Sequence, residues 1–143
     1  MTDSATVLPE HIRAFLGADR FVAIATTDAD GAPRQAVAWY RLEGDTIVLN
    51  SRVGRRWPAN LVRDERVALA VIDDADGERW VGLTGRVEVI REQATAQADI
   101  AGMARRYHAA APDTAARMIA TFETQERISF HVRIDAIHDH LDD

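Results

Sequence analysis

The chain has 143 residues, of which 47% are hydrophobic, and a formal net charge of −6. This size fits a single domain spanning 1–143, and the acidic balance argues against nucleic acid and anionic membranes as partners. Because the chain has no cysteine and all 17 basic residues are arginine, disulfides, thiolate metal sites and lysine Schiff bases are excluded.

The amino terminus, MTDSATVLPE, is polar and acidic and does not resemble a secretory signal. No apolar run approaches the ~18 residues that a membrane span requires. The sequence therefore predicts a soluble, cytoplasmic protein.

The predicted elements are mostly strands. A first helix is expected at 9–16, where Leu8, Ile12, Phe15 and Leu16 share one face. Apolar and β-branched runs predict six strands, at 21–27, 33–42, 46–50, 66–72, 79–90 and 127–137. Further helices are predicted at 58–63, 92–107 and 112–121, and the terminal HDHLDD is expected to fray. We interpret this order as a mainly β (α+β) fold, a small six-stranded antiparallel barrel with short flanking helices.

The most informative segment is 50–71, NSRVGRRWPANLVRDERVALAV. Arg52, Arg55 and Arg56 lie in a glycine-containing turn just before a short helix opened by Pro58. Free N–H groups and the positive end of the helix dipole add to the guanidinium groups, which bind phosphate oxygens in a bidentate manner. Because the chain as a whole is acidic, this local charge predicts a phosphorylated small molecule as ligand. The alternative is that the arginines form a solvated surface turn.

Other signatures of catalysis are missing from the sequence. It contains no P-loop, no GxGxxG, no GxSxG and no convincing pair of carboxylates. His138 and His140 would share a strand face, but no third ligand accompanies them, so no metal site is expected. No side chain stands out as an acid or nucleophile, and no catalytic residue is predicted.

Four segments together resemble one known family. They are FVAIATTDADGAPRQAVAWY, SRVGRRWPANLVRDERVALAV, RWVGLTGRVEVI and RISFHVRIDAIHDH, which span nearly the whole chain. The chain resembles the pyridoxamine 5'-phosphate oxidase-like flavin and deazaflavin oxidoreductases, and within them the branch that uses coenzyme F420. The resemblance implies a split β-barrel of the FMN-binding type and a homodimer with the cofactor between its subunits. Trp57 stands where related deazaflavin enzymes often carry a lysine, so Arg55 and Arg56 are expected to take over its phosphate contact.

The resemblance directs attention to one group of residues as the cofactor site. The expected cofactor-binding residues are Ala38, Asn50, Ser51, Arg52, Arg55, Arg56, Trp57, Asn60 and Trp80. The phosphate is expected at the arginines and at the N–H groups near Trp57 to Asn60, with Asn50 and Ser51 reaching the ribityl chain or the phosphate. Asn60 has the alternative role of holding the turn.

The ring of the cofactor needs a flat apolar slot. Small Ala38 would let it lie close to the backbone, while Trp39 would cap the slot, pack at a dimer interface or belong to the core. Trp80 aligns with an aromatic position of the family and is expected near the cofactor, supplied by the same or the other subunit.

The function implied by the resemblance is hydride transfer from reduced F420 to a conjugated, electron-poor small molecule such as a quinone, an enone or a tetrapyrrole. The absence of a dinucleotide fingerprint leaves a nicotinamide cofactor without a recognisable site. Two alternatives remain: an FMN-dependent oxidoreductase of the same fold, and a non-catalytic protein that binds flavin, deazaflavin or haem.

Overall fold

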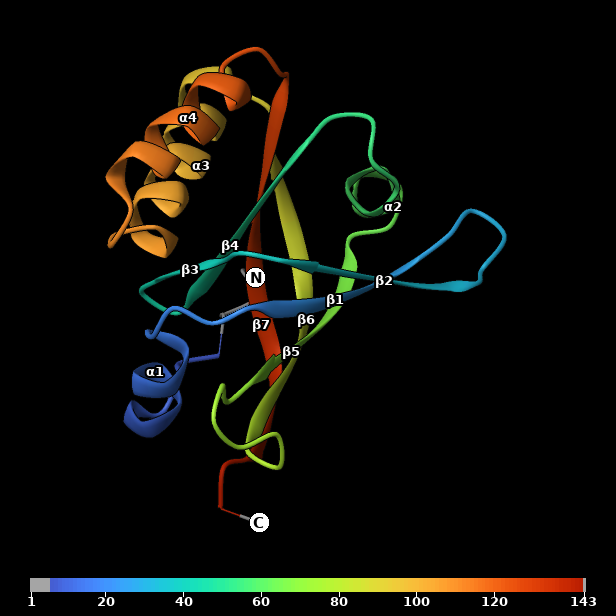
Figure 1. The fold of residues 1–143 in the computed structure, drawn as a ribbon. Coiled ribbons are helices and arrows are strands. Elements are labelled where there is room, and N and C mark those ends of the chain that lie inside the picture. Colours follow the sequence, from blue (N-terminus) through green and yellow to red (C-terminus); the bar gives the residue numbers. More distant parts are fainter. Residues whose placement is uncertain (1–5, 143) are drawn as a thin grey trace.

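The computed structural model describes residues 6–142, which form one antiparallel sheet and four helices (Figure 1). The strands follow one another across the sheet in the order β2-β1-β5-β6-β7-β4-β3. Their bounds are Val22–Thr27 (β1), Pro33–Ala38 (β2), Arg41–Glu43 (β3), Thr46–Arg52 (β4), Arg66–Ile72 (β5), Trp80–Ile90 (β6) and Arg127–His140 (β7). The helices are Glu10–Leu16 (α1), Arg56–Arg63 (α2), Gln93–Tyr107 (α3) and Pro112–Phe122 (α4).

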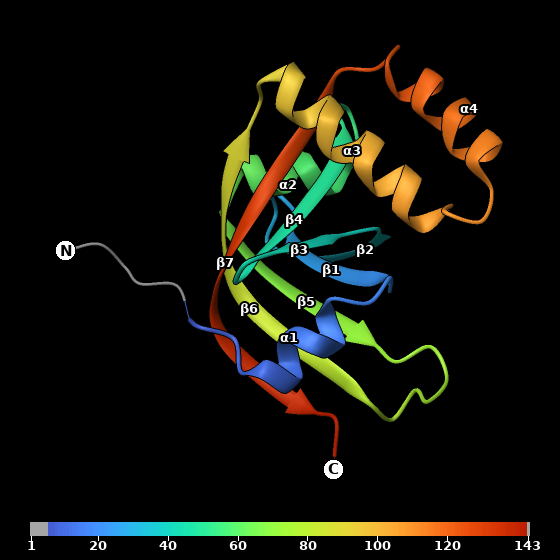
Figure 2. The same ribbon diagram turned by 90° about the vertical axis from the view of Figure 1, so that its left-hand side faces the viewer.

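The connection between the two edge strands makes the sheet curl. β2 and β3 lie at opposite edges of the sheet, yet only Trp39 and Tyr40 separate them in the chain. Such a short connection can join the edges only if the sheet bends until they approach each other, as the curved strands in Figure 2 show. The split-barrel architecture expected from the sequence is therefore confirmed.

The prediction of six strands is wrong by one, because the run at 33–42 is broken. At the break, the backbone N–H of Tyr40 donates to the Tyr107 hydroxyl (3.2 Å), not to a neighbouring strand. The Tyr40 side chain turns inward, is fully buried and donates to the Leu16 carbonyl oxygen (2.7 Å). These two anchors end β2 and let β3 begin as a seventh strand.

The ends of two other elements also differ from the predictions. The expected frayed tail is wrong, since β7 continues to His140, which lies opposite Trp80 in the ladder with β6. The second helix begins at Arg56, two residues before the predicted start, with Pro58 in its first turn, where a missing N–H costs no helical hydrogen bond.

The core lies inside the curl. Alternate residues of the strands point inward, among them Val22, Ile24, Leu69 and Val81, all with at most 4% of their surface exposed. Side chains of α1 and α2 complete this core, while α3 packs against the outward side of β4 and β7 and α4 packs against α3 (Figure 1). Within 6–142, no helix is long and apolar enough to cross a membrane.

Candidate functional site

A pocket of about 270 Å³ lies where the two edges of the curled sheet approach each other. One wall comes from Val37 and Ala38 at the end of β2, and another from Asn50 and Ser51 at the end of β4. The residues just before β1 and just after β2, the start of α2, the inner side of α3, the end of α4 and the start of β7 supply the rest. The pocket therefore collects residues that are far apart in the sequence because the sheet closes on itself at this point.

The lining of this pocket is apolar on one side and cationic on the other. Its apolar and aromatic residues are Phe21, Val37, Ala38, Trp39, Trp57, Ile100, Met103 and Phe122. Its polar residues are Asn50, Ser51, Arg55 and Arg127. Five of the nine predicted site residues, Ala38, Asn50, Ser51, Arg55 and Trp57, are thus brought together at this pocket.

Trp39 is one of the two tryptophans that line the pocket. Its ring stacks on Tyr107, with centroids 5.2 Å apart and planes at 10°, and meets the edge of Phe122. Trp57 packs at the other side against Phe130 of the core, with ring centroids 5.8 Å apart. The aromatic walls are therefore anchored by other rings.

Arg127, which sequence reasoning did not single out, is the buried cation of the pocket. Only 6% of its surface is exposed, and its Nε and Nη2 donate to Asn50 Oδ1 at 3.0 and 2.9 Å. Its Nη1 donates to Gln125 Oε1 at 2.6 Å. Across residues 6–142 it forms no ion pair with a carboxylate. Burial, and to a lesser degree the nearby charges of Arg55 and Arg52, lowers its pKa to about 10.

Asn50 is held by the protein on both sides of its amide. Its Nδ2 donates to the Ala96 carbonyl oxygen and to Ser129 Oγ, each at 2.9 Å, while its Oδ1 accepts from Arg127. Ser129 in turn donates to Asp99 Oδ2 (2.7 Å). With both N–H groups and the oxygen engaged, Asn50 orients Arg127 instead of presenting a free group to the pocket.

The three arginines of the turn have different surroundings. Arg55 lines the pocket and Arg52 lies opposite Arg127 in the ladder between β4 and β7; both are exposed, and neither has an acidic partner within 6–142. Arg56 instead points toward Asp28, with Nη1 3.6 Å from Oδ2. Part of its charge is therefore already balanced by the turn between β1 and β2.

Asn60 lies inside the protein, 3% exposed, and does not line the pocket. Its Nδ2 donates to Thr26 Oγ1 (3.1 Å) and to Asp28 Oδ1 (2.9 Å), and its Oδ1 accepts from Arg63 (3.2 Å). These bonds tie α2 to the end of β1. Hydrogen bonds from Arg34 and Asn60 are the main reason why the pKa of Asp28 is lowered.

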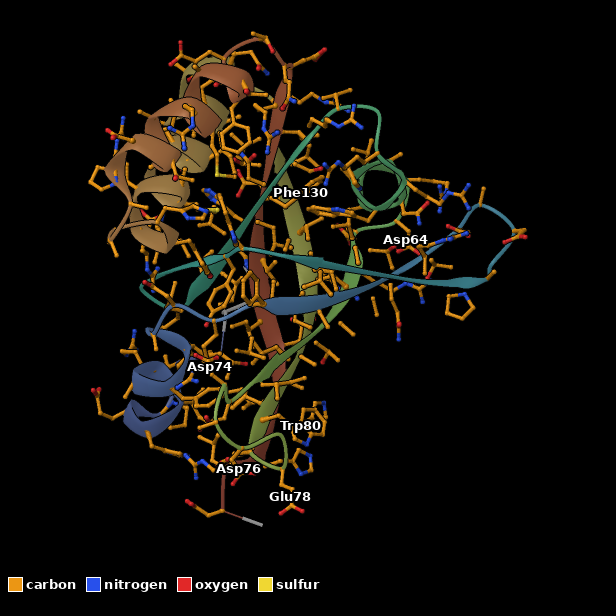
Figure 3. The ribbon with its side chains drawn as sticks, in the orientation of Figure 1. Asp64, Asp74, Asp76, Glu78, Trp80 and Phe130 are labelled. Atoms are coloured by element: carbon orange, nitrogen blue, oxygen red, sulfur yellow. The ribbon has the colours of Figure 1, made fainter. Side chains whose placement is uncertain are left out.

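Trp80 lies at the opposite end of the molecule from the arginine turn. Figure 3 places it low on the molecule, well away from Phe130, which lies beside α2. Its ring stacks on His140, with centroids 4.3 Å apart, on the outward side of the sheet. It does not line the pocket of its own chain, so it could reach such a pocket only in a second copy.

Larger hollows exist elsewhere but lack this combination of groups. Two, of about 570 and 620 Å³, follow α3 and α4, and one of about 590 Å³ lies beside Asp28 and the end of α2. The hollow of about 570 Å³ is lined by three alanines with Arg105, His108, Pro112 and Ile119, and the hollow beside Asp28 is lined mostly by polar residues. None of them joins an aromatic wall to a buried cation.

The sequence did not indicate that Arg127 is a buried site residue, because it stands at the start of an apolar strand, where an arginine is usually solvated. What could have found it is the alternation of Arg127, Ser129 and His131, the polar side of a strand whose other side is apolar. In the structure α3 covers this polar side, and the covering helix buries the arginine.

Comparison with known proteins agrees with the family resemblance seen in the sequence, over nearly the whole chain. The family model for pyridoxamine 5'-phosphate oxidase matches residues 8–136. Among curated proteins, none matches in sequence.

Solved structures share the fold at low sequence identity. An F420 reductase superposes with a TM-score of 0.73 at 21% identity, covering 92% of this chain and 98% of its own. A conserved hypothetical protein from Mycobacterium tuberculosis gives 0.75 at 22%, with 98% and 90% covered. HutZ, the heme storage protein from Vibrio cholerae, gives 0.70 at 17%, with 94% and 95% covered. Because the family model covers nearly all of the chain, from α1 into β7, this protein belongs to the pyridoxamine 5'-phosphate oxidase family.

Proposed function

We propose that this protein is an F420-dependent oxidoreductase that reduces a conjugated, electron-poor small molecule of the quinone, enone or tetrapyrrole type. The observation that carries the proposal is the pocket between the sheet edges, which combines a flat aromatic wall with Arg55 and Arg127, two arginines without an acidic partner among residues 6–142. A planar ring with a phosphorylated tail has this same division between an apolar and an anionic part. The likeness to an F420 reductase supports the choice of deazaflavin.

The residues fit such a cofactor in distinct roles. Ala38 and Trp39 would bound the ring, since the small side chain leaves room beside the strand and the indole is fixed by Tyr107. Arg55, with Arg52 nearby, would hold the anionic tail, and Ser51 would hydrogen-bond the chain between ring and phosphate. When bound, reduced F420 would supply a hydride, and the protein would contribute binding, orientation and exclusion of water.

The outward face of the sheet supports a homodimer. Val37, Ala23, Ala70 and Gly82 lie side by side across four strands, as their pairing in the ladders shows. Val37 and Ile72 are 70% and 48% exposed on this side, and Trp80 lies opposite Ile72. An apolar surface that crosses a sheet without a covering helix is typical of a protein–protein contact.

A second copy bound at the outward face would also help to form the pocket. Phe21 and Val37 line the pocket and are exposed, so a second copy on the outward face would cover the pocket's open side. A volume of about 270 Å³ is also small beside the roughly 300–1,000 Å³ typical of ligand pockets. We therefore propose that the complete cofactor site lies between two subunits, with Trp80 available to the partner's site.

Stopped-flow oxidation of reduced F420 tests the proposal. We expect the purified protein to oxidise reduced F420 with menadione as acceptor and to show no comparable turnover with NADPH. The same assay with reduced FMN is the control for the cofactor. Turnover with FMN alone would overturn the deazaflavin assignment and favour the FMN-dependent alternative.

Binding without turnover would instead favour a carrier protein. Haem is the least suited of these ligands to the pocket, because it needs an axial ligand such as histidine and no histidine of the described chain lines this pocket. An absorbance titration with haem provides the check, since a tight complex with a sharp Soret band would place a haem site elsewhere on the protein.

A further inference from the structure

Among residues 6–142, Arg127 is a buried charged residue with no carboxylate partner. The backbone of Arg127 is fixed from both sides by Gln93, whose Oε1 accepts from its N–H (2.9 Å) and whose Nε2 donates to its carbonyl oxygen (2.8 Å). The side chain is fixed by Asn50 and Gln125 and lies over the ring of Phe122, with Cζ 4.7 Å from the centroid. A residue held this firmly is preorganised to bind.

The nearest buried carboxylate is already paired elsewhere. Asp99, joined to Asn50 through Ser129, lies 3.1 Å from the guanidinium of Arg41, on the side of the network away from Arg127. Asn50 therefore stands between a cation and an anion, and gives Arg127 a neutral acceptor only. The charge of Arg127 stays available for a ligand.

Arg127 also retains donors for a ligand. A guanidinium carries five N–H groups, and the hydrogen bonds found within 6–142 engage three of them, one at each nitrogen. One N–H on each terminal nitrogen is left, and the residue lines the pocket beside Arg55. Two such groups form the fork that binds two oxygens of a phosphate.

We propose that Arg127 is the inner anion-binding residue of the pocket, which holds the phosphate group of the cofactor, and that Asn50 is its positioning residue. Arg55 then closes the same subsite from the exposed side. The proposal rests on the proposed function, since it assigns the cofactor's phosphate to this pocket. Burial and the two further arginines nearby lower the pKa of Arg127, and a bound anion would offset both effects.

Paired ligands with and without a phosphate test this assignment. FMN and riboflavin share a ring and differ only in the phosphate. F420 can be compared with its deazariboflavin core, which lacks the phosphate and the acidic chain attached to it. We expect Arg127→Gln, whose amide can still donate to Asn50, to weaken FMN and F420 binding at least tenfold, while binding of riboflavin and of the deazariboflavin core should change less than twofold.

Two other variants complete the comparison. Arg127→Lys keeps a charge without the fork and should give an intermediate loss. Arg117→Gln makes the same chemical change on the exposed side of α4 and should leave all four affinities unchanged. An equal loss for ligands with and without phosphate, or no loss for either, would overturn the proposal.

Inorganic phosphate gives a measurement that does not depend on the cofactor. At constant ionic strength, replacing chloride by phosphate should raise the thermal midpoint of the wild type and of Arg117→Gln, and leave that of Arg127→Gln unchanged. If the wild type binds neither FMN nor F420, the proposed function fails and this phosphate effect alone decides on Arg127. If the wild type binds them and Arg127→Gln binds equally well, only the assignment of Arg127 fails.

Discussion

Two neighbouring arginines of the turn, Arg55 and Arg56, differ in what their charge already contacts. Arg55 lines the pocket with no acidic partner in the described part of the chain, whereas Arg56 lies 3.6 Å from Asp28. A charge-assisted hydrogen bond to a ligand contributes about 1.5–3 kcal/mol, while an exposed ion pair contributes about 0–1 kcal/mol. Although Arg55 and Arg56 are adjacent in the sequence, they are therefore not expected to contribute equally to ligand binding.

We expect Arg55→Ala to weaken cofactor binding by about ten- to a hundredfold, in line with the loss of one such contact. Arg56→Ala should weaken it by less than about fivefold, because its charge is partly balanced by Asp28. Titration of cofactor fluorescence gives both affinities, and far-ultraviolet circular dichroism checks that each variant is folded. Equal effects of the two substitutions would show that the ion pair with Asp28 does not limit the contribution of Arg56 to cofactor binding.

The charge of Arg127 also makes stability depend on pH at the alkaline end. Its pKa in the folded protein, about 10, lies below the ordinary value of an arginine, so the unfolded chain binds more protons from about pH 10 upward. Folding stability from this group therefore rises as pH increases through about 10 and is lowest where Arg127 is fully charged. In urea unfolding between pH 8 and 11, the stability of the wild type relative to Arg127→Gln should therefore rise with pH, and a bound phosphate should reduce that rise.

At the residue scale, local sequence signals could point to candidate residues, whereas residues whose surroundings come from a distant segment could not be recognised. Three arginines ahead of a helix are visible in the sequence, and Arg55 indeed lines the pocket. The burial of Arg127 depends on α3 crossing β7, and no spacing within the strand reports that crossing. The two roles considered for Asn60 could not be separated from sequence either, because its partners Thr26 and Asp28 lie more than thirty residues away.

At the scale of elements, Asn60 connects α2 to β1. Its side chain donates hydrogen bonds to Thr26 of β1 and to Asp28 in the turn that follows. Asp28 also forms ion pairs with Arg34 and Arg56. The helix then presents Trp57 and its first turn to the pocket. Most strands were predictable because they alternate or are continuously apolar, whereas the break at Trp39 and Tyr40 depends on Tyr107 of α3 and was not.

Asn60→Ala should lower the free energy of unfolding by about 1–3 kcal/mol, because it removes buried hydrogen bonds and leaves Thr26 without its partner. Chemical denaturation measures the change. Cofactor affinity under native conditions should fall less than in Arg55→Ala, since Asn60 does not line the pocket. An unchanged stability together with a large loss of affinity would assign Asn60 to direct ligand contact.

At the scale of the whole molecule, the closing of the barrel and the proposed dimer contact involve the same region. The pocket lies at the split between the sheet edges, and its exposed residues Phe21 and Val37 border the outward face. Sequence alternation predicts that this face exists, but only the register of the strands shows that its small residues lie in one row. The assignment of Trp80 to a site depends entirely on this face. Within its own chain Trp80 does not line the pocket, and it lies well away from Phe130, which packs against Trp57 of the pocket (Figure 3).

We expect the wild type to be a dimer in light scattering at micromolar concentration, and Ile72→Asp to be a monomer of 15.8 kDa. Ile72 is 48% exposed in the single chain, so an aspartate there leaves the fold intact, but burying its charge in an interface costs several kcal/mol. Val62→Asp is the matched control, since Val62 is 44% exposed on α2, away from the outward face, and should leave the dimer unchanged. Cofactor affinity should fall in Ile72→Asp together with the loss of the dimer, although Ile72 does not line the pocket. A monomeric wild type that binds the cofactor tightly would contradict a shared site and would require one chain to hold the whole ligand.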